Sequence, residues 1–434
     1  MKKITFIIIA TLITFAAYFT ACVEEPNGDK FPTDKYFYDI PDVPVTENYV
    51  VGTFYHELTE RYWFRVIANQ VTKNMPEGYT GTPLLPSLLG LDTVGRNGGY
   101  FMNEDYTWGG EPWGTKGTPG KILQQQLAWG KQAGIDFFLI SWNGKGTDTL
   151  LFNFKNTWKE GDPKAVVIFD CGHLYRRTAD SLHISTPPNF TKAVLLRQID
   201  SLKMFFDEPY YYKLNGTTPL FGFDNYKRTN SVAGTVDEVR EHLGGNVYLI
   251  SPTIERGNGY TSPEFLVDIR NRFSSKDVYI FREDGRKDGK VQMPFDAIYQ
   301  PAMLTDNYNR YGYDNWRRNF FSLIDYNYGY WKQTLKSDYN IEYIPSVMPA
   351  FDNFKNDSTS NILRLPGTEI RLLQREESGE LYKTYANVGK RNAGKNRIVL
   401  INSWNNFKQG TNLEPTVEFG DAYLNFTRKY FKKD

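Results

Sequence analysis

Short apolar runs alternate with longer polar or amphipathic stretches along most of this chain. Eight such runs occur, at residues 49–55, 136–142, 165–170, 219–223, 246–251, 297–299, 343–347 and 397–403. Residues 124–134 and 195–206, which lie between runs, carry apolar side chains at helical spacing. Apolar strands that alternate with helices indicate a parallel sheet buried on both faces. Eight of them favour an α/β fold, a (β/α)8 TIM barrel with long βα-loop insertions.

The main alternative is an open, doubly wound parallel sheet. No Gly-rich phosphate-binding turn follows the first apolar run, which makes that alternative less favoured. The seventh run contains Pro345, a residue that fits poorly in the middle of a strand. We nevertheless count it as the seventh strand.

The first 48 residues have a different character from the rest. Lys2 and Lys3 precede an apolar stretch, residues 4–21, that ends in small residues before Cys22. This pattern resembles a bacterial lipoprotein signal, although a plain membrane anchor is an alternative. We therefore predict a signal peptide at residues 1–21 and lipidation of Cys22. Residues 22–48, rich in Pro, Asp, Glu and Gly, are predicted as a flexible tether, and residues 49–434 as the barrel domain.

The expected location follows from this leader. The acidic pair Glu24-Glu25 after Cys22 resembles the surface-export signal of Bacteroidetes lipoproteins. We expect the protein to be anchored in the bacterial outer membrane by the lipid on Cys22 alone and to be exposed at the surface.

Composition excludes several classes of partner. Lys and Arg number 51 and Asp and Glu 50, so no bulk basic field would hold a nucleic acid. With 4 His and 2 Cys we predict no metal and no cofactor. The aromatic content of 16% is high and suits a cleft lined by rings that stack on sugars. A monomer is expected.

The C-terminal ends of barrel strands carry the chemistry in this fold. Aromatic and amide side chains gather at those positions here, as expected for a neutral polysaccharide or oligosaccharide ligand. The candidates for substrate binding are Tyr55, Trp108, Trp142, Asn143, Tyr226 and Trp404. Of these, Trp108 comes from a long Gly-rich loop, residues 106–120. Core packing is the alternative for each ring.

Carboxylates also follow several predicted strands. Hydrolysis of a glycosidic bond usually requires a pair of acids. Asp170, Asp224 and Glu255 are the candidate catalytic residues, and Glu57 and Asp352 stand at comparable positions. Asp170 and Asp224 end neighbouring strands and are expected to face each other. Each of these acids, taken alone, has a structural hydrogen-bonding role as its alternative.

The last predicted strand leads into a specific motif. Residues 401–415 read INSWNNFKQGTNLEP. They resemble the signature of glycoside hydrolase family 99 and its relatives in family 71, in which S-[FYW]-N-E-W is followed by x-E-G-T-x-I-E-P. Residues 51–55, 124–144, 344–349 and 420–424 resemble further segments of that family. The resemblance implies a (β/α)8 barrel that acts on an α-mannoside-type glycan.

This chain departs from the family at two positions. The two glutamates of the motif are the family's proposed base and general acid/base, and here those positions are Asn406 and Gln409. An amide does not exchange a proton near neutral pH as a carboxylate does, but it still bonds hydroxyls. Three hypotheses remain open: an enzyme with relocated carboxylates, an inactive glycan-binding protein that uses Asn406 and Gln409 with Trp142 and Trp404, and a barrel without a ligand.

Overall fold

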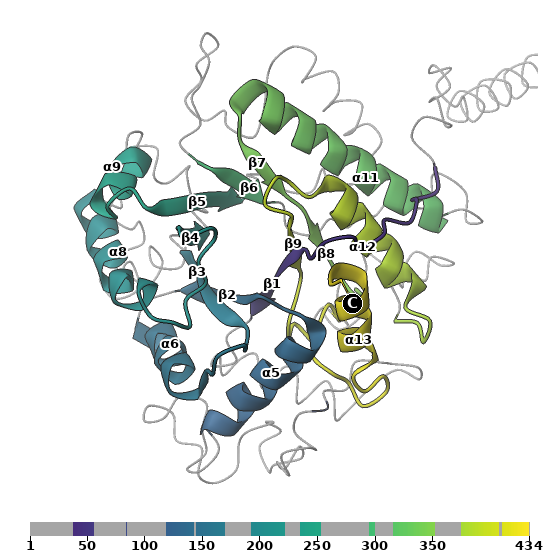
Figure 1. Ribbon diagram of the computed structural model, residues 1–434, viewed down its shortest axis with the longest axis horizontal. Helices are drawn as coiled ribbons and strands as arrows, with labels where there is room; N and C mark the ends of the chain where they lie inside the picture. The colour runs from purple at the N-terminus through teal and green to yellow at the C-terminus, as the bar shows by residue number, and fades with distance from the viewer. Residues whose placement is uncertain are drawn as a thin grey trace, which may run out of the picture.

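A parallel β-barrel surrounded by helices forms the centre of the molecule (Figure 1). The computed structural model describes residues 38–55, 84, 119–142, 145–169, 192–221, 235–252, 295–299, 316–351, 375–407 and 410–433. The strands are β1 (Val50–Tyr55), β2 (Phe137–Trp142), β3 (Lys164–Phe169), β4 (Thr218–Phe221), β5 (Val247–Pro252), β6 (Ala297–Tyr299), β7 (Glu342–Ile344), β8 (Ser346–Val347) and β9 (Ile398–Ile401). Each of the eight predicted runs overlaps a strand or, in the seventh, a pair of strands.

Pro345 explains why the seventh run appears as two strands. β7 pairs with β6, and β8, one residue later, pairs with β9. Pro345 has no N–H to donate, but its carbonyl accepts the N–H of Leu400 at 3.0 Å. The segment from Glu342 to Val347 therefore bonds to a neighbour on each side, and the sheet order β7-β6-β5-β4-β3-β2-β1-β9-β8 closes on itself. The (β/α)8 barrel is confirmed, and the open doubly wound sheet is wrong.

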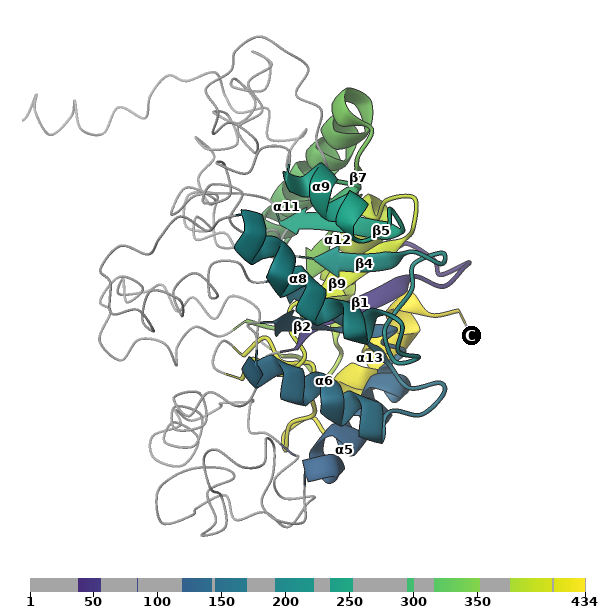
Figure 2. The ribbon, with the colours of Figure 1, turned by 90° about the vertical axis from the view of Figure 1, so that its left-hand side faces the viewer.

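Helices cover the outside of the barrel. They are α5 (Pro119–Ala133), α6 (Lys145–Thr157), α8 (Lys192–Phe206), α9 (Thr235–His242), α11 (Trp316–Thr334), which continues into the π-helical turn η5 (Leu335–Tyr339), α12 (Glu380–Asn392) and α13 (Ala422–Phe431). Figure 2 shows α5, α6, α8 and α9 in succession beside the strands. The two helices predicted from sequence correspond to α5 and α8. Among the residues that the structure describes, no helix has the length and apolar character needed to span a membrane.

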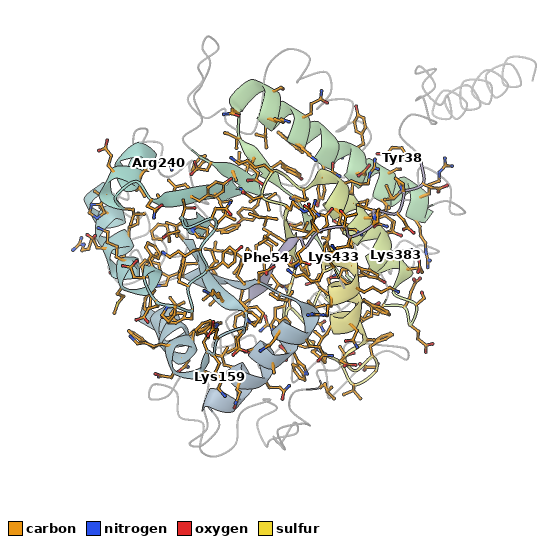
Figure 3. All side chains as sticks on the ribbon, in the orientation of Figure 1. Tyr38, Phe54, Lys159, Arg240, Lys383 and Lys433 are labelled. Atoms are coloured by element: carbon orange, nitrogen blue, oxygen red, sulfur yellow. The ribbon has the colours of Figure 1, made fainter. Side chains whose placement is uncertain are left out.

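The core has two layers, because successive strand residues point to opposite faces of the sheet. Phe137 and Leu139 belong to the cluster inside the barrel, whereas Phe138 and Ile140 belong to the cluster between the sheet and the helices. Phe54 lies near the centre of the barrel in Figure 3, and its ring centroid is 5.9 Å from that of Tyr299 on β6. Both faces of the strands are thus apolar.

The last part of the predicted tether is packed against the barrel domain. The carboxylate of Asp42 accepts hydrogen bonds from Lys383 at 3.0 Å and from Asn387 at 2.8 Å, both on α12. Lys390 donates to the carbonyl of Val43 at 2.6 Å, and burial lowers the pKa of its amine to about 8. Residues 38–48 are therefore part of the folded domain, and any tether ends before Tyr38. Residues 1–37 lie outside the described part of the chain.

Gly52 on β1 provides a test of the inner packing. A Cβ at this position would lie 2.2 Å from Cε2 of Phe137 and 2.9 Å from Cδ2 of Leu400. Gly52→Ala should lower the free energy of unfolding by about 1–3 kcal/mol through overpacking, as measured by urea denaturation. Phe137→Leu should relieve the clash, so the double variant should lose less stability than the two single variants together. Additive losses would contradict this packing.

Candidate functional site

The closing loop, which we define as residues 402–416, leaves the C-terminal end of β9 and folds back on itself. The N–H of Ser403 donates to the carbonyl of Thr411 at 2.9 Å, and the N–H of Glu414 donates to that of Trp404 at 2.7 Å. The loop is also attached to β1, because the N–H of Trp404 donates to the carbonyl of Phe54 at 2.8 Å. Backbone hydrogen bonds thus hold the described part of the loop at the end of the barrel that carries chemistry in this fold.

Asn406 occupies a well-defined position in this loop. Its N–H donates to Oγ of Ser403 at 2.8 Å, and its carbonyl accepts the N–H of Thr411 at 3.2 Å. The hydroxyls of Ser403 and Thr411 are themselves 3.0 Å apart. The residue is 8% exposed. The backbone therefore places Asn406 independently of what its carboxamide contacts. Gln409, the second amide of the motif, lies outside the described residues.

Arg375 supports the far side of the loop. Its guanidinium donates to the carbonyl of Asn412 and, at 3.5 Å, to that of Gly410. It also lies over the ring of Tyr423 on α13, 4.8 Å from the centroid. Burial lowers its pKa to about 10, so the group remains a cation at neutral pH. A lone arginine outside any motif gave no signal in the sequence, and we did not predict this role.

A buried carboxyl group anchors the loop on the side of α5. Oε2 of Glu414 accepts a hydrogen bond from Nε2 of Gln126 at 2.9 Å, and Oε1 of Gln126 accepts one from the hydroxyl of Tyr55 at 2.7 Å. The indole of Trp404 lies near the carboxyl group of Glu414 and acts to lower its pKa. The indole N–H nevertheless forms no well-aligned hydrogen bond. Burial dominates and raises the pKa of Glu414 to about 8. The carboxyl group is therefore largely protonated at neutral pH.

Three rings predicted to stack on sugar lie instead in the outer core layer. Tyr55, Trp142 and Trp404 are 2%, 1% and 0% exposed. Phe138 lies against both Tyr55 and Trp404, with centroids 5.3 and 5.0 Å away, and Trp142 is stacked on Phe169 at 5.7 Å. Protein side chains cover these rings, so the structure favours the core-packing alternative over sugar stacking for all three.

The other predicted site residues lie outside the described part of the chain. They are Cys22, Trp108, Asn143, Asp170, Asp224, Tyr226, Glu255 and Gln409. The strands that precede the three acids, β3, β4 and β5, are consecutive in the sheet. The described residues contain no group of three metal-ligating side chains. The absence of a metal and of a cofactor stays a prediction.

Solved structures with a similar fold are known. A solved structure described as a glycoside hydrolase-like protein is similar over 92% of this chain and 99% of its own, with a TM-score of 0.57 and 18% identity. Two structures of the family 99 endo-α-mannosidase from Bacteroides thetaiotaomicron, one with bis-tris propane, are similar over 89% of this chain and 97% of theirs. Their TM-scores are 0.48 and 0.47, at 16% identity. The barrel implied by the motif resemblance is confirmed by the strand order of the structure itself.

A match to a protein-family model shows the family to which the chain belongs. Residues 183–427, more than half of the chain, match the family described as Glycosyltransferase WbsX. The chain belongs to the WbsX glycosyltransferase family. A search among curated proteins found no significant match.

The raised pKa of Glu414 predicts a pH dependence of stability. The folded protein holds a proton on this group up to pH about 8, whereas the ordinary pKa is 4.5. The free energy of unfolding should therefore fall as pH rises from 4.5 to 8, because the folded state binds more protons over that range. Glu414→Gln should remove this contribution, which thermal denaturation at several pH values would show.

The control for this experiment is Glu377→Gln, because Glu377 is exposed. That variant should keep the wild-type pH dependence. A wild-type slope that persists in Glu414→Gln would contradict the assignment of the titration to Glu414.

Proposed function

We propose that the protein acts on the glycosidic bonds of a polysaccharide, of α-mannoside type, at the C-terminal end of its barrel. The observation that carries this proposal is the closing loop. Its described residues are fastened to β1 through Trp404 and Phe54, to α5 through Glu414, and to Arg375. A site held by buried contacts of this kind is preorganised for a ligand.

The amide at position 406 favours a second candidate, a protein that binds the glycan without cleaving it. General acid–base catalysis contributes roughly 10²–10⁴-fold in rate, and Asn406 lacks a titratable proton. Relocated carboxylates would restore this chemistry. Asp170 follows β3 directly and Asp224 follows β4 closely, and these two strands are neighbours in the barrel. We propose this pair, with Glu255 after β5 as a further acid.

The family description supports a related reaction. A glycosyltransferase moves a sugar to an acceptor hydroxyl, whereas a hydrolase moves it to water. Both reactions break a bond at the anomeric carbon of a bound sugar, so one sugar-binding site could serve either. Transfer is therefore a second reaction outcome of the same site.

The proposed location is the outer surface of the bacterial cell, with the lipid on Cys22 as the anchor. Because residues 38–48 are packed on the barrel domain, only the segment between Cys22 and Tyr38 would separate it from the membrane. That segment would reach about 55 Å if fully extended. Radiolabelled fatty acid should be incorporated by the full chain and lost in Cys22→Ala.

The activity is tested with the mature, unlipidated protein and a panel of glycans that includes yeast mannan and other α-mannans. Chromatography of the products over a day distinguishes the candidates. Shortened oligosaccharides show hydrolysis, and elongated acceptors show transfer. Intact glycan that co-elutes with the protein shows binding alone. Asp224→Asn should abolish turnover, and unchanged turnover would contradict the proposed carboxylate pair. A protein that neither changes nor retains any glycan would contradict the proposal.

The two amides of the motif are tested by variants. Asn406→Ala should weaken glycan retention on an affinity gel about tenfold, as expected for one lost hydrogen bond of ordinary net strength. Asn425→Ala is the control, because Asn425 is exposed on α13. In the double variant Asn406→Glu with Gln409→Glu, new α-mannosidase activity would be expected if the rest of the family's site persists. Retention unaffected by Asn406→Ala would contradict a role for this residue.

A further inference from the structure

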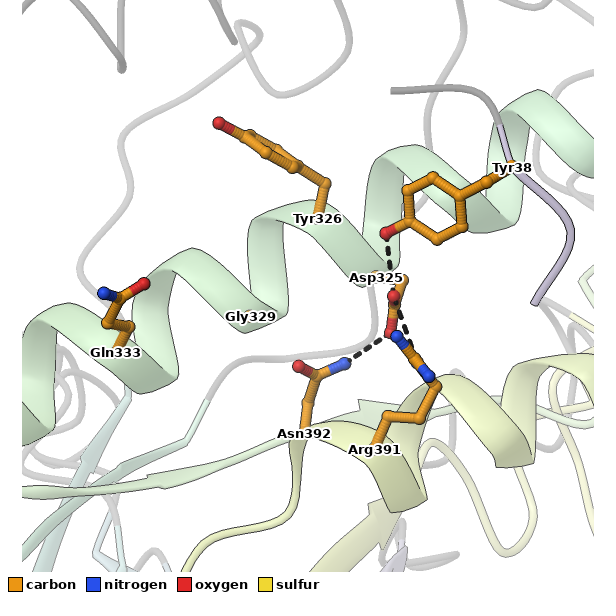
Figure 4. Close-up of a pocket in the computed structure, with 7 residues that line it drawn as sticks. All are labelled: Tyr38, Asp325, Tyr326, Gly329, Gln333, Arg391 and Asn392. Carbon is orange, nitrogen blue, oxygen red and sulfur yellow. Dashed lines mark hydrogen bonds and ion pairs between the residues drawn. The ribbon is translucent and has the colours of Figure 1, made fainter. Parts of the chain in front are cut away.

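A polar pocket lies between the N-terminal segment and helices α11 and α12, and no described residue of the closing loop lines it. It has a volume of about 520 Å³, within the range of small-molecule sites. Three separate segments form its walls: Tyr38 at the start of the packed N-terminal segment, residues of α11, and Arg391 and Asn392 at the end of α12 (Figure 4). The described part of the structure thus brings distant parts of the chain together around one concavity.

Asp325 organises this pocket. Its carboxylate is 5% exposed and accepts hydrogen bonds from the Tyr38 hydroxyl at 2.8 Å, from Nε of Arg391 at 3.1 Å and from Nδ2 of Asn392 at 2.8 Å. These bonds fix the phenol, the guanidinium and the carboxamide relative to one another, as Figure 4 shows. The carboxylate accepts from three donors, so its effect is to position the groups around it.

Other polar groups of the pocket remain available. Gln333 is exposed, and its carboxamide makes no hydrogen bond to any residue that the structure describes. Arg391 uses Nε for Asp325, and within the described residues its two terminal nitrogens have no partner. A ligand in the pocket would therefore meet several hydrogen-bond donors and an amide acceptor.

Gly329 leaves the pocket open. Asp325, Gly329 and Gln333 are spaced by four residues and lie on one face of α11. Glycine in a helix interior is unfavourable relative to alanine. Packing does not require glycine here, because an added Cβ would meet Oδ1 of Asn392 only at 3.4 Å, an ordinary contact distance. The missing side chain instead leaves space between Asp325 and Gln333.

The charges of the pocket indicate what kind of molecule it takes. Asp325 and Arg391 are its charged lining groups. They form an ion pair with each other, so their charges balance. Lys332 lies beside them and donates to the backbone carbonyl of Arg391 at 3.1 Å. Tyr38 and Tyr326 add partly exposed phenol rings. Rings together with planar polar side chains suit the mixed apolar and hydroxylated surface of a sugar.

We propose that this pocket is a binding site for a neutral saccharide unit, separate from the site at the end of the barrel. The inference does not depend on the proposed function, because it rests on the residues of α11, α12 and the N-terminal segment. The two sites are distinguished by variants that change one and leave the other intact.

The test uses the mature protein and saturation-transfer NMR with methyl α-mannoside, methyl β-glucoside, maltose and cellobiose, followed by calorimetry for those that bind. At least one neutral sugar should bind in the millimolar range. Gln333→Ala should weaken its binding about tenfold. Gln198→Ala is the control, since Gln198 lies on α8 outside the pocket. Asn406→Ala changes the other site, so it should leave the part of the binding that Gln333→Ala weakens unchanged.

Variants of Gly329 separate ligand binding from stability. Gly329→Ala should raise the melting temperature through helix propensity while weakening sugar binding. Gly329→Leu should fill the pocket and abolish binding at this site. Three results would overturn the proposal: no binding by any sugar of the panel, equal binding in wild type and Gly329→Leu, or tighter binding of methyl glucuronide than of every neutral sugar.

Discussion

The buried hydrogen-bond chain from Glu414 through Gln126 to Tyr55 is the interaction on which the candidate site depends. It joins the closing loop, helix α5 and strand β1, which are far apart in the sequence. A carboxyl group can lie in this apolar layer because it is largely protonated, with a pKa raised to about 8. Removal of any one partner would leave a buried polar group unsatisfied, which is costly.

Strand β1 connects these hydrogen bonds to the rest of the barrel. It pairs with β2 on one side and β9 on the other, and its last residues carry both the Tyr55 hydroxyl and the carbonyl that holds Trp404. The position of the closing loop thus follows from the closure of the barrel. Closure in turn requires the pairing of β8 with β9 beyond Pro345. The N-terminal segment strengthens the outer layer at α11 and α12 and forms one wall of the polar pocket.

The strands and the closing motif were predictable because they depend on local patterns. Apolar runs bounded by polar stretches marked every strand of the barrel, including the short one at residues 297–299. The roles of Tyr55, Trp142 and Trp404 were not predictable in the same way. Strands that are apolar on both faces have no polar side to show which residues point into the barrel. The contacts of Arg375 and Gln126 with the closing loop had no sequence signal, because their partners are distant along the chain.

The sequence alone determined the barrel class, the order of its strands and the place where the closing loop begins, since periodicity and length control these features. Tertiary structure decided which rings are core, which carboxyl group is protonated, and where residues 38–48 pack. Those properties depend on burial and on partners brought together by closure of the barrel, as with Asp42 and α12 or Glu414 and α5. Local sequence carries no record of such distances, so only the folded chain shows them.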